Sequence, residues 1–181
     1  MKRLLSEKAD ANARVDGDDN KQCALHRACC KDNVEIAEVL LAHGADIDAK
    51  SYKGYTSLHF ACMLGLKEMI IFLISKGASL KGIVFILLKS HMSVEITKSK
   101  FFSYTTETQH LGRTALHVAC LANVNATNCS LGKAICEVLI VNGSSLTVET
   151  INFKDTPLQC ACWKGYEELS TFLASTGADI Y

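Results

Sequence analysis

The amino-acid sequence predicts an all-α fold in which short helix pairs, joined by hairpins, stack into an elongated, curved solenoid. Three observations predict it. A seven-residue string occurs four times, a glycine-led turn follows each copy, and the apolar residues between string and turn have helical spacing. Two short helices cannot bury their apolar faces alone, so neighbouring pairs must cover each other.

The four strings share one frame. In chain order they read CALHRAC, TSLHFAC, TALHVAC and TPLQCAC, starting at Cys23, Thr56, Thr114 and Thr156. The turns that follow are GAD, GAS, GSS and GAD, starting at Gly44, Gly77, Gly143 and Gly177. From His26 to Gly44 is 18 residues, and Leu25 and Leu58 of the first two strings are 33 residues apart. A fixed spacing of this kind indicates a structural repeat.

The second copy shows why each unit should hold two helices and a hairpin. Leu58, Ala61 and Cys62 recur at the spacing of one helix face, and residues 69–74 form a second, more apolar stretch. We expect Gly65 and Gly77 to end these helices, because glycine adopts the left-handed cap conformation at least cost. The Thr56 hydroxyl is expected to cap the first helix.

A 33-residue unit with a T-P-L-H-x-A string resembles the ankyrin repeat. The resemblance covers nearly the whole chain and implies stacked ankyrin units. We expect a single array with a partial repeat at 1–16 and full repeats at 17–49, 50–82, 108–149 and 150–181.

Residues 83–107 match no repeat position, and three interpretations stay open. The segment is a projecting hairpin finger, a disordered insertion, or translated sequence foreign to the family. A second, shorter insertion near Asn123 to Gly132 lengthens repeat three. Insertions at surface turns cost little closure entropy, so neither should prevent the repeats from folding.

Composition restricts the classes of partner and compartment. The 19 basic and 19 acidic residues give a net charge of zero, which disfavours nucleic acid. The longest apolar run, residues 83–88, is too short to insert into a membrane, and the N-terminus lacks a secretory signal. We therefore expect a cytoplasmic protein, with the nucleus as the alternative, whose nine cysteines stay reduced.

The sequence offers histidine and cysteine residues but no convincing catalytic or metal site. His26, His59 and His117 each precede a cysteine by three residues, which raises the hypothesis of zinc. These residues recur one repeat apart, too far for one tetrahedral site, and the resemblance implies that the histidines stabilise turns. Phosphate-loop, dinucleotide and hydrolase motifs are absent. We expect a protein that is not an enzyme and that binds no cofactor, no metal and no small-molecule substrate.

The resemblance also implies where another protein would bind. Ankyrin proteins usually bind partners with the variable positions of the first helix and with the hairpin tips. The first-helix positions hold Cys30, Lys31, Met63, Leu64, Leu121, Ala122, Trp163 and Lys164, and the hairpin residues are Lys50, Tyr52, Lys53, Tyr55, Phe153 and Lys154. Met63, Leu64, Leu121 and Trp163 would form an exposed apolar strip, with Trp163 as its anchor. The alternative is that segment 83–107 or a flanking repeat covers the strip.

Two functions are consistent with these patterns. The first is an interaction module or scaffold that binds a partner protein on its concave surface. The second is a regulatory or targeting fragment of a larger kinase, ubiquitin-ligase adaptor or channel, because neither end of the sequence has the features of a capping repeat. The partner itself cannot be identified from a scaffold that supports many specificities.

Overall fold

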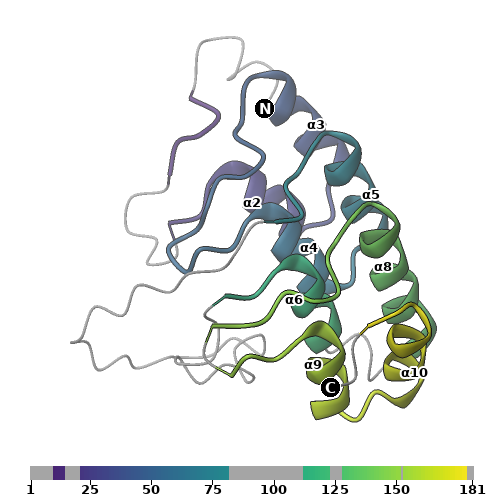
Figure 1. Ribbon diagram of the computed structural model, residues 1–181. Helices are drawn as coiled ribbons and strands as arrows, with labels where there is room; N and C mark the ends of the chain where they lie inside the picture. The colour runs from purple at the N-terminus through teal and green to yellow at the C-terminus, as the bar shows by residue number, and fades with distance from the viewer. Residues whose placement is uncertain (1–9, 15–20, 82–111, 123–127, 152, 179–181) are drawn as a thin grey trace, which may run out of the picture.

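The computed structural model describes residues 10–14, 21–81, 112–122, 128–151 and 153–178, and these form an array of helix pairs (Figure 1). The helices are α2 (Ala24–Cys30), α3 (Val34–Ala42), α4 (Ser57–Leu64), α5 (Lys67–Ser75), α6 (Ala115–Leu121), α8 (Cys129–Val141), α9 (Pro157–Trp163) and α10 (Glu167–Ser175). The predicted all-α solenoid is confirmed. No helix in these ranges is long and apolar enough to cross a membrane.

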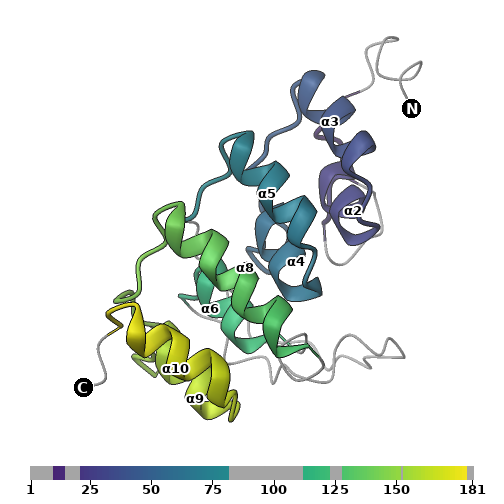
Figure 2. The ribbon, with the colours of Figure 1, turned by 90° about the vertical axis from the view of Figure 1, so that its right-hand side faces the viewer.

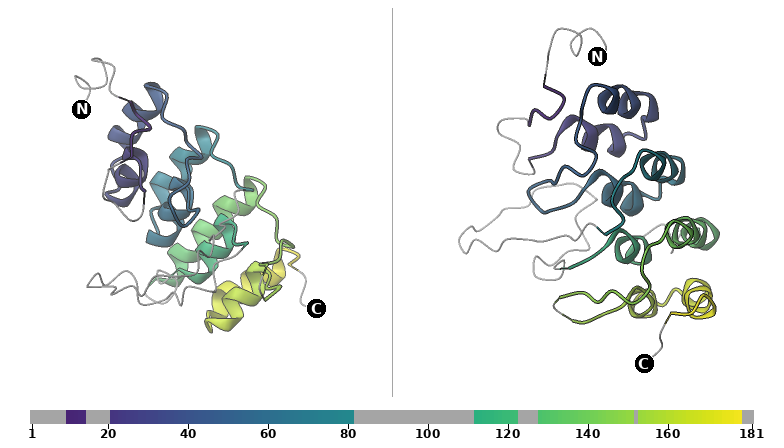
Figure 3. Two further views of the ribbon diagram at one scale, coloured as in Figure 1. Left: turned by 90° about the vertical axis from the view of Figure 1, so that its left-hand side faces the viewer. Right: turned by 45° about the horizontal axis from the view of Figure 1, so that its top comes forward.

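The helices form two parallel rows. The first helices of the pairs, α2, α4, α6 and α9, pack in succession and are called the inner row below. The second helices, α3, α5, α8 and α10, form the outer row, which faces the viewer in Figure 2. The connections between pairs extend from the helices on the side away from the outer row (Figure 3).

Each first helix begins with a threonine or its substitute. Thr56 and Thr114 precede α4 and α6 in extended conformation. Each donates its backbone N–H to the ring of the histidine three residues later, His59 or His117. Thr156 precedes α9 in the same way, and Pro157 occupies the first helical turn, where its missing N–H costs nothing. At α2, Cys23 takes the place of the threonine.

Glycine ends the helices where the sequence predicts. Gly65 follows α4 with φ of 73°, and its neighbour Leu66 donates its N–H to the carbonyl of Ala61 at 3.0 Å. Gly77 follows α5 with φ of 92°. Side chains with a Cβ disfavour this left-handed region, so both positions favour glycine.

The core runs along the array between the rows. Leu58, Leu116 and Ile70 are completely buried, as are the string cysteines Cys29, Cys62 and Cys120. The Sγ atoms of Cys120 and Cys136 lie 3.9 Å apart between α6 and α8. The cysteines thus act as small apolar residues in a tightly packed interior.

Polar side chains in the hairpins join successive repeats. Asn12 donates from Nδ2 to the carbonyl of Gly44 at 3.0 Å and accepts the N–H of Asp46 at 2.7 Å. One repeat later, Asp48 accepts the N–H of Ser79 at 2.9 Å. These bonds fix the offset between neighbouring turns.

The segment 83–107 and most of the partial repeat 1–16 lie outside the described residues. The repeats on either side of the long segment nevertheless stack directly, because α4 packs on α6 and α5 packs on α8. Among the described residues, one helix pair lies in each of the four predicted repeat ranges. The repeat boundaries themselves stay a prediction.

Candidate partner-binding surface

The string histidines use their rings to hold the backbone. Nδ1 of His117 accepts the N–H of Thr114 at 3.2 Å, and Nε2 lies 3.1 Å from the carbonyl oxygen of Asp155 in the next repeat. His26 is equivalent: its Nδ1 accepts the N–H of Cys23, and its Nε2 contacts the carbonyls of Ala49 and Tyr55. Each of these rings therefore caps its own helix and links it to the following hairpin.

This geometry fixes the tautomer of His117. An Nδ1 that accepts an N–H must carry a lone pair, so the ring proton resides on Nε2 and is donated to Asp155. Burial lowers the pKa of His117 to about 4; the bond to Asp155 opposes this change and the charge of Arg113 adds to it. A ring held neutral in this way is a structural element.

The buried string cysteines Cys29, Cys62 and Cys160 are poor nucleophiles. Burial raises the pKa of Cys29 and of Cys160 to about 12, and it raises that of Cys62 further. At Cys23 burial also favours the thiol, but the hydrogen bond and charge of His26 outweigh it and lower the pKa. Cys23 is only 2% exposed, so solvent and substrates do not reach it.

Clusters of three or more metal-binding side chains do not occur within the described ranges. The ring nitrogens of His117 are occupied by backbone groups, the N–H of Thr114 and the carbonyl of Asp155.

The predicted strip on the inner row is exposed mainly at one end. Trp163, at the C-terminal end of α9, is 82% exposed, and Lys164 next to it is also exposed. Met63, Leu64 and Leu121 are half-buried, and Met63 and Leu121 pack against the core. Neighbouring helices cover part of these side chains, so the strip is less continuous than the sequence predicts.

At the opposite end of the inner row, Lys31 follows α2 and is exposed. Lys31 and Trp163 are thus separated by the full length of the array. The role of both residues in partner binding stays a prediction.

In the hairpin before α4, the exposure of the side chains matches the prediction only in part. Lys50 and Tyr52 are exposed and Lys53 is half-buried. The placement of Tyr55 at the surface was wrong: it is 6% exposed, with its ring centroid 5.7 Å from that of Phe60 and 6.0 Å from that of His59. Tyr55 directly precedes the helix cap, where the chain turns back toward the inner row.

The hairpin before α9 exposes more apolar surface than the sequence predicts. Phe153 is 59% exposed, and Ile151, which sequence patterns did not single out, is 47% exposed. Lys154 contacts Glu149 at 3.8 Å. The signal that could have identified Ile151 is its position in the same tip as Phe153, two residues away.

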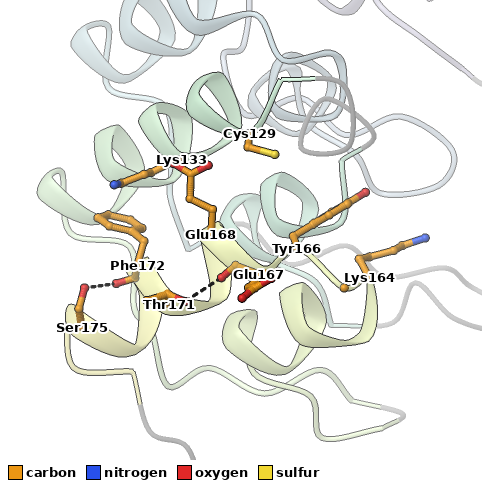
Figure 4. A pocket seen from close by; sticks show the side chains of 10 residues that line it. Cys129, Lys133, Lys164, Tyr166, Glu167, Glu168, Thr171, Phe172 and Ser175 are labelled. Atoms are coloured by element: carbon orange, nitrogen blue, oxygen red, sulfur yellow. Dashed lines mark hydrogen bonds between the residues drawn. The ribbon is translucent and has the colours of Figure 1, made fainter.

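A groove of about 870 Å³ lies between α8 and α10 (Figure 4). Its lining residues are Cys129, Lys133, Lys164, Gly165, Tyr166, Glu167, Glu168, Thr171, Phe172 and Ser175. Nζ of Lys133 lies 5.2 Å from the centre of the Phe172 ring. The lining charges are of both signs, so they do not select one class of ligand.

Comparison with known proteins settles the family. The family model for ankyrin repeats in three copies matches residues 1–82 and again 78–181. The chain belongs to the ankyrin-repeat family. Members of this family are protein-interaction modules, and the resemblance inferred from the four strings is confirmed.

Several curated proteins match parts of the ankyrin array. A putative ankyrin repeat protein of Acanthamoeba polyphaga mimivirus is 33% identical over 43% of the chain and 10% of its own length. Human protein phosphatase 1 regulatory subunit 27 is 42% identical over 30% of the chain and 36% of its length. The chicken nuclear factor NF-kappa-B p105 subunit is 26% identical over 87% of the chain and 16% of its length. The chain therefore spans about a third or less of these relatives.

Proposed function

We propose that this chain is a binding module without catalytic activity, which recognises a partner protein through its inner row and hairpins. The observation that carries the proposal is the exposure of Trp163, 82%, at the end of an inner helix. A large aromatic side chain left in water is typical of residues that contribute most of an interface's binding energy. We also propose that the protein binds its partner in the cytoplasm, with the nucleus as the alternative.

The names of two relatives support a regulatory role achieved by binding. One is a regulatory subunit of protein phosphatase 1, and another is the chicken NF-kappa-B inhibitor alpha, 48% identical over 24% of the chain. Both names describe proteins that act on another protein. These relatives share the ankyrin array with this chain. We therefore propose for this chain their general role, regulation by binding, and not their individual partners.

The test compares two exposed apolar residues on different rows. Proteins retained from cell extract by the immobilised chain are identified by mass spectrometry, purified, and titrated against wild type, Trp163→Ala and Val141→Ala. Val141 is the control because it is 80% exposed but belongs to the outer helix α8. We expect Trp163→Ala to weaken binding about 30-fold, which corresponds to about 2 kcal/mol, and Val141→Ala to leave it unchanged.

Equal affinity of all three proteins for the purified partner would contradict the assignment of Trp163. Failure of every purified candidate to bind wild type would contradict the function itself. Far-UV circular dichroism of each variant verifies that the array is folded.

A second candidate is a regulatory region within a larger protein. The rice potassium channel AKT1 is 42% identical over 37% of the chain, yet the match covers only 7% of the channel. An antibody against the array would then detect an endogenous protein much larger than 19.7 kDa. A single endogenous species of 19.7 kDa would exclude this candidate.

A further inference from the structure

The two rows of the array differ in charge although the whole chain is neutral. Acidic residues of the outer-row helices outnumber the lysines Lys67 and Lys133; they are Glu35, Glu38, Glu68, Glu137, Glu167 and Glu168. The inner-row helices contain no acidic residue. The basic side chains of the inner row, its helix ends and the described hairpins, called the basic face below, are Arg14, Lys21, Arg27, Lys31, Lys50, Lys53, Lys81, Arg113, Lys154 and Lys164.

Several carboxylates near the basic face are already engaged by backbone amides. Asp10 accepts the N–H of Asn12 at 2.8 Å, Asp46 that of Asp48 at 3.0 Å, and Asp48 that of Ser79 at 2.9 Å. These bonds hold the carboxylates within the hairpins. With Asp32, Glu149 and Asp155, the described carboxylates on this side number six, against ten basic side chains, so the basic face carries a net positive charge.

Exposed aromatic rings accompany the basic groups. Among the described residues, the large aromatic side chains most exposed to solvent are Tyr52, Phe153 and Trp163, at 53%, 59% and 82%. Each is followed directly by a lysine, namely Lys53, Lys154 and Lys164. The surface thus pairs an apolar contact with a positive charge at three places in the hairpins and inner row.

We propose that the partner recognised by this surface is an acidic protein segment that carries apolar side chains, laid along the basic face. This inference rests on the proposed function and names the chemistry of the partner. Carboxylates of the segment would face the lysines while its apolar side chains contact the three aromatic rings. A nucleic acid fits less well, because the basic groups are spread over four repeats and Asp32, Glu149 and Asp155 lie among them.

The test uses random peptides displayed on phage and selected on the immobilised full chain. Two double variants are compared with wild type: Lys31→Glu with Lys154→Glu on the basic face, and Lys67→Glu with Lys76→Glu at the outer row. Both change the net charge equally.

We expect the selected peptides to be rich in Asp, Glu and large apolar residues. At low salt the basic-face variant should bind them at least about tenfold more weakly than wild type, and this difference should narrow as salt increases, because salt screens the attraction that the variant has lost; the outer-row variant should match wild type throughout.

Three results would overturn the inference. Selected peptides without acidic bias would show that charge does not choose the partner, and the proposed function would stand. Selection of no peptide, while a purified partner protein binds through Trp163, would show that the partner presents a folded surface. Tighter binding of an oligothymidine probe than of any selected peptide would assign the basic face to nucleic acid.

Discussion

Acidification should destabilise the array through His117. Its pKa is about 4 in the folded chain, compared with an ordinary value of 6.5. Above the ordinary value the ring is neutral in both folded and unfolded chains. Between the two values the unfolded chain binds a proton that the folded chain excludes, so the free energy of unfolding falls as pH falls. The contribution of this ring is lost completely below about pH 4.

The size of the effect follows from the two pKa values. Full protonation of His117 would cost about 3 kcal/mol, and at about pH 5 the loss would be about 2 kcal/mol. The main cause is burial, which disfavours the charged ring, and the charge of Arg113 adds to it. A proton on Nδ1 would also face the N–H of Thr114, which that atom now accepts.

Repeat four provides the control variant. Gln159 occupies the histidine position there, and its Oε1 accepts the N–H of Thr156 at 2.7 Å. His117→Gln should therefore keep an acceptor for Thr114 and remove the titrating group. Urea unfolding followed by far-UV circular dichroism at about pH 8 and about pH 5 measures both proteins. We expect wild type to lose about 2 kcal/mol more than His117→Gln over this range, and an equal loss in both would refute the assignment.

Three further results are expected. Gly112→Ala should destabilise the fold by more than about 2 kcal/mol, and Gly77→Ala by about 1 kcal/mol. Both residues have positive φ, but a Cβ at Gly112 would lie 2.6 Å from the backbone nitrogen of Ile151, whereas one at Gly77 would meet nothing. Equal losses of stability in thermal unfolding would contradict this difference. A thiol reagent should label the folded protein at the exposed cysteines and reach the buried ones only in denaturant, as peptide mass spectrometry would show; the exposed ones are Cys30, Cys129 and Cys162. Tyr55→Ala should lower stability by about 3 kcal/mol because it empties a buried site against Phe60, whereas a surface residue would give less than about 0.5 kcal/mol.

Local patterns were sufficient to predict the helix pairs. The spacing from His26 to Gly44 defines one complete pair, and glycine chemistry at Gly65 defines where a helix ends. The threonine caps were also predictable, although the histidine at the third helical position proved to be the partner that completes them. These features depend on residues close together in sequence, so they can be inferred without knowing the stack.

Exposure was harder to predict because it depends on neighbours. Met63 and Leu121 occupy positions that are variable in the family, yet packing against the core leaves them half-buried. Tyr55 is polar at one end and lies near a hairpin tip, but its ring fits beside Phe60. No single-repeat pattern reveals such contacts. The charge difference between the rows became apparent only when the helices were sorted by row.

The two nitrogens of His117 serve two different repeats, and this sets the size of the cooperative unit. In a linear stack, each pair contacts only its neighbours, and opening can remain local when the coupling between pairs is weak. One imidazole that holds the start of α6 and also binds Asp155 makes it costly to open either repeat without the other. Replacing the ring with alanine would uncouple them, and amide exchange in repeat four would then accelerate independently of repeat three. The same side chain that shapes one helix start thus couples the opening of one repeat to that of the next.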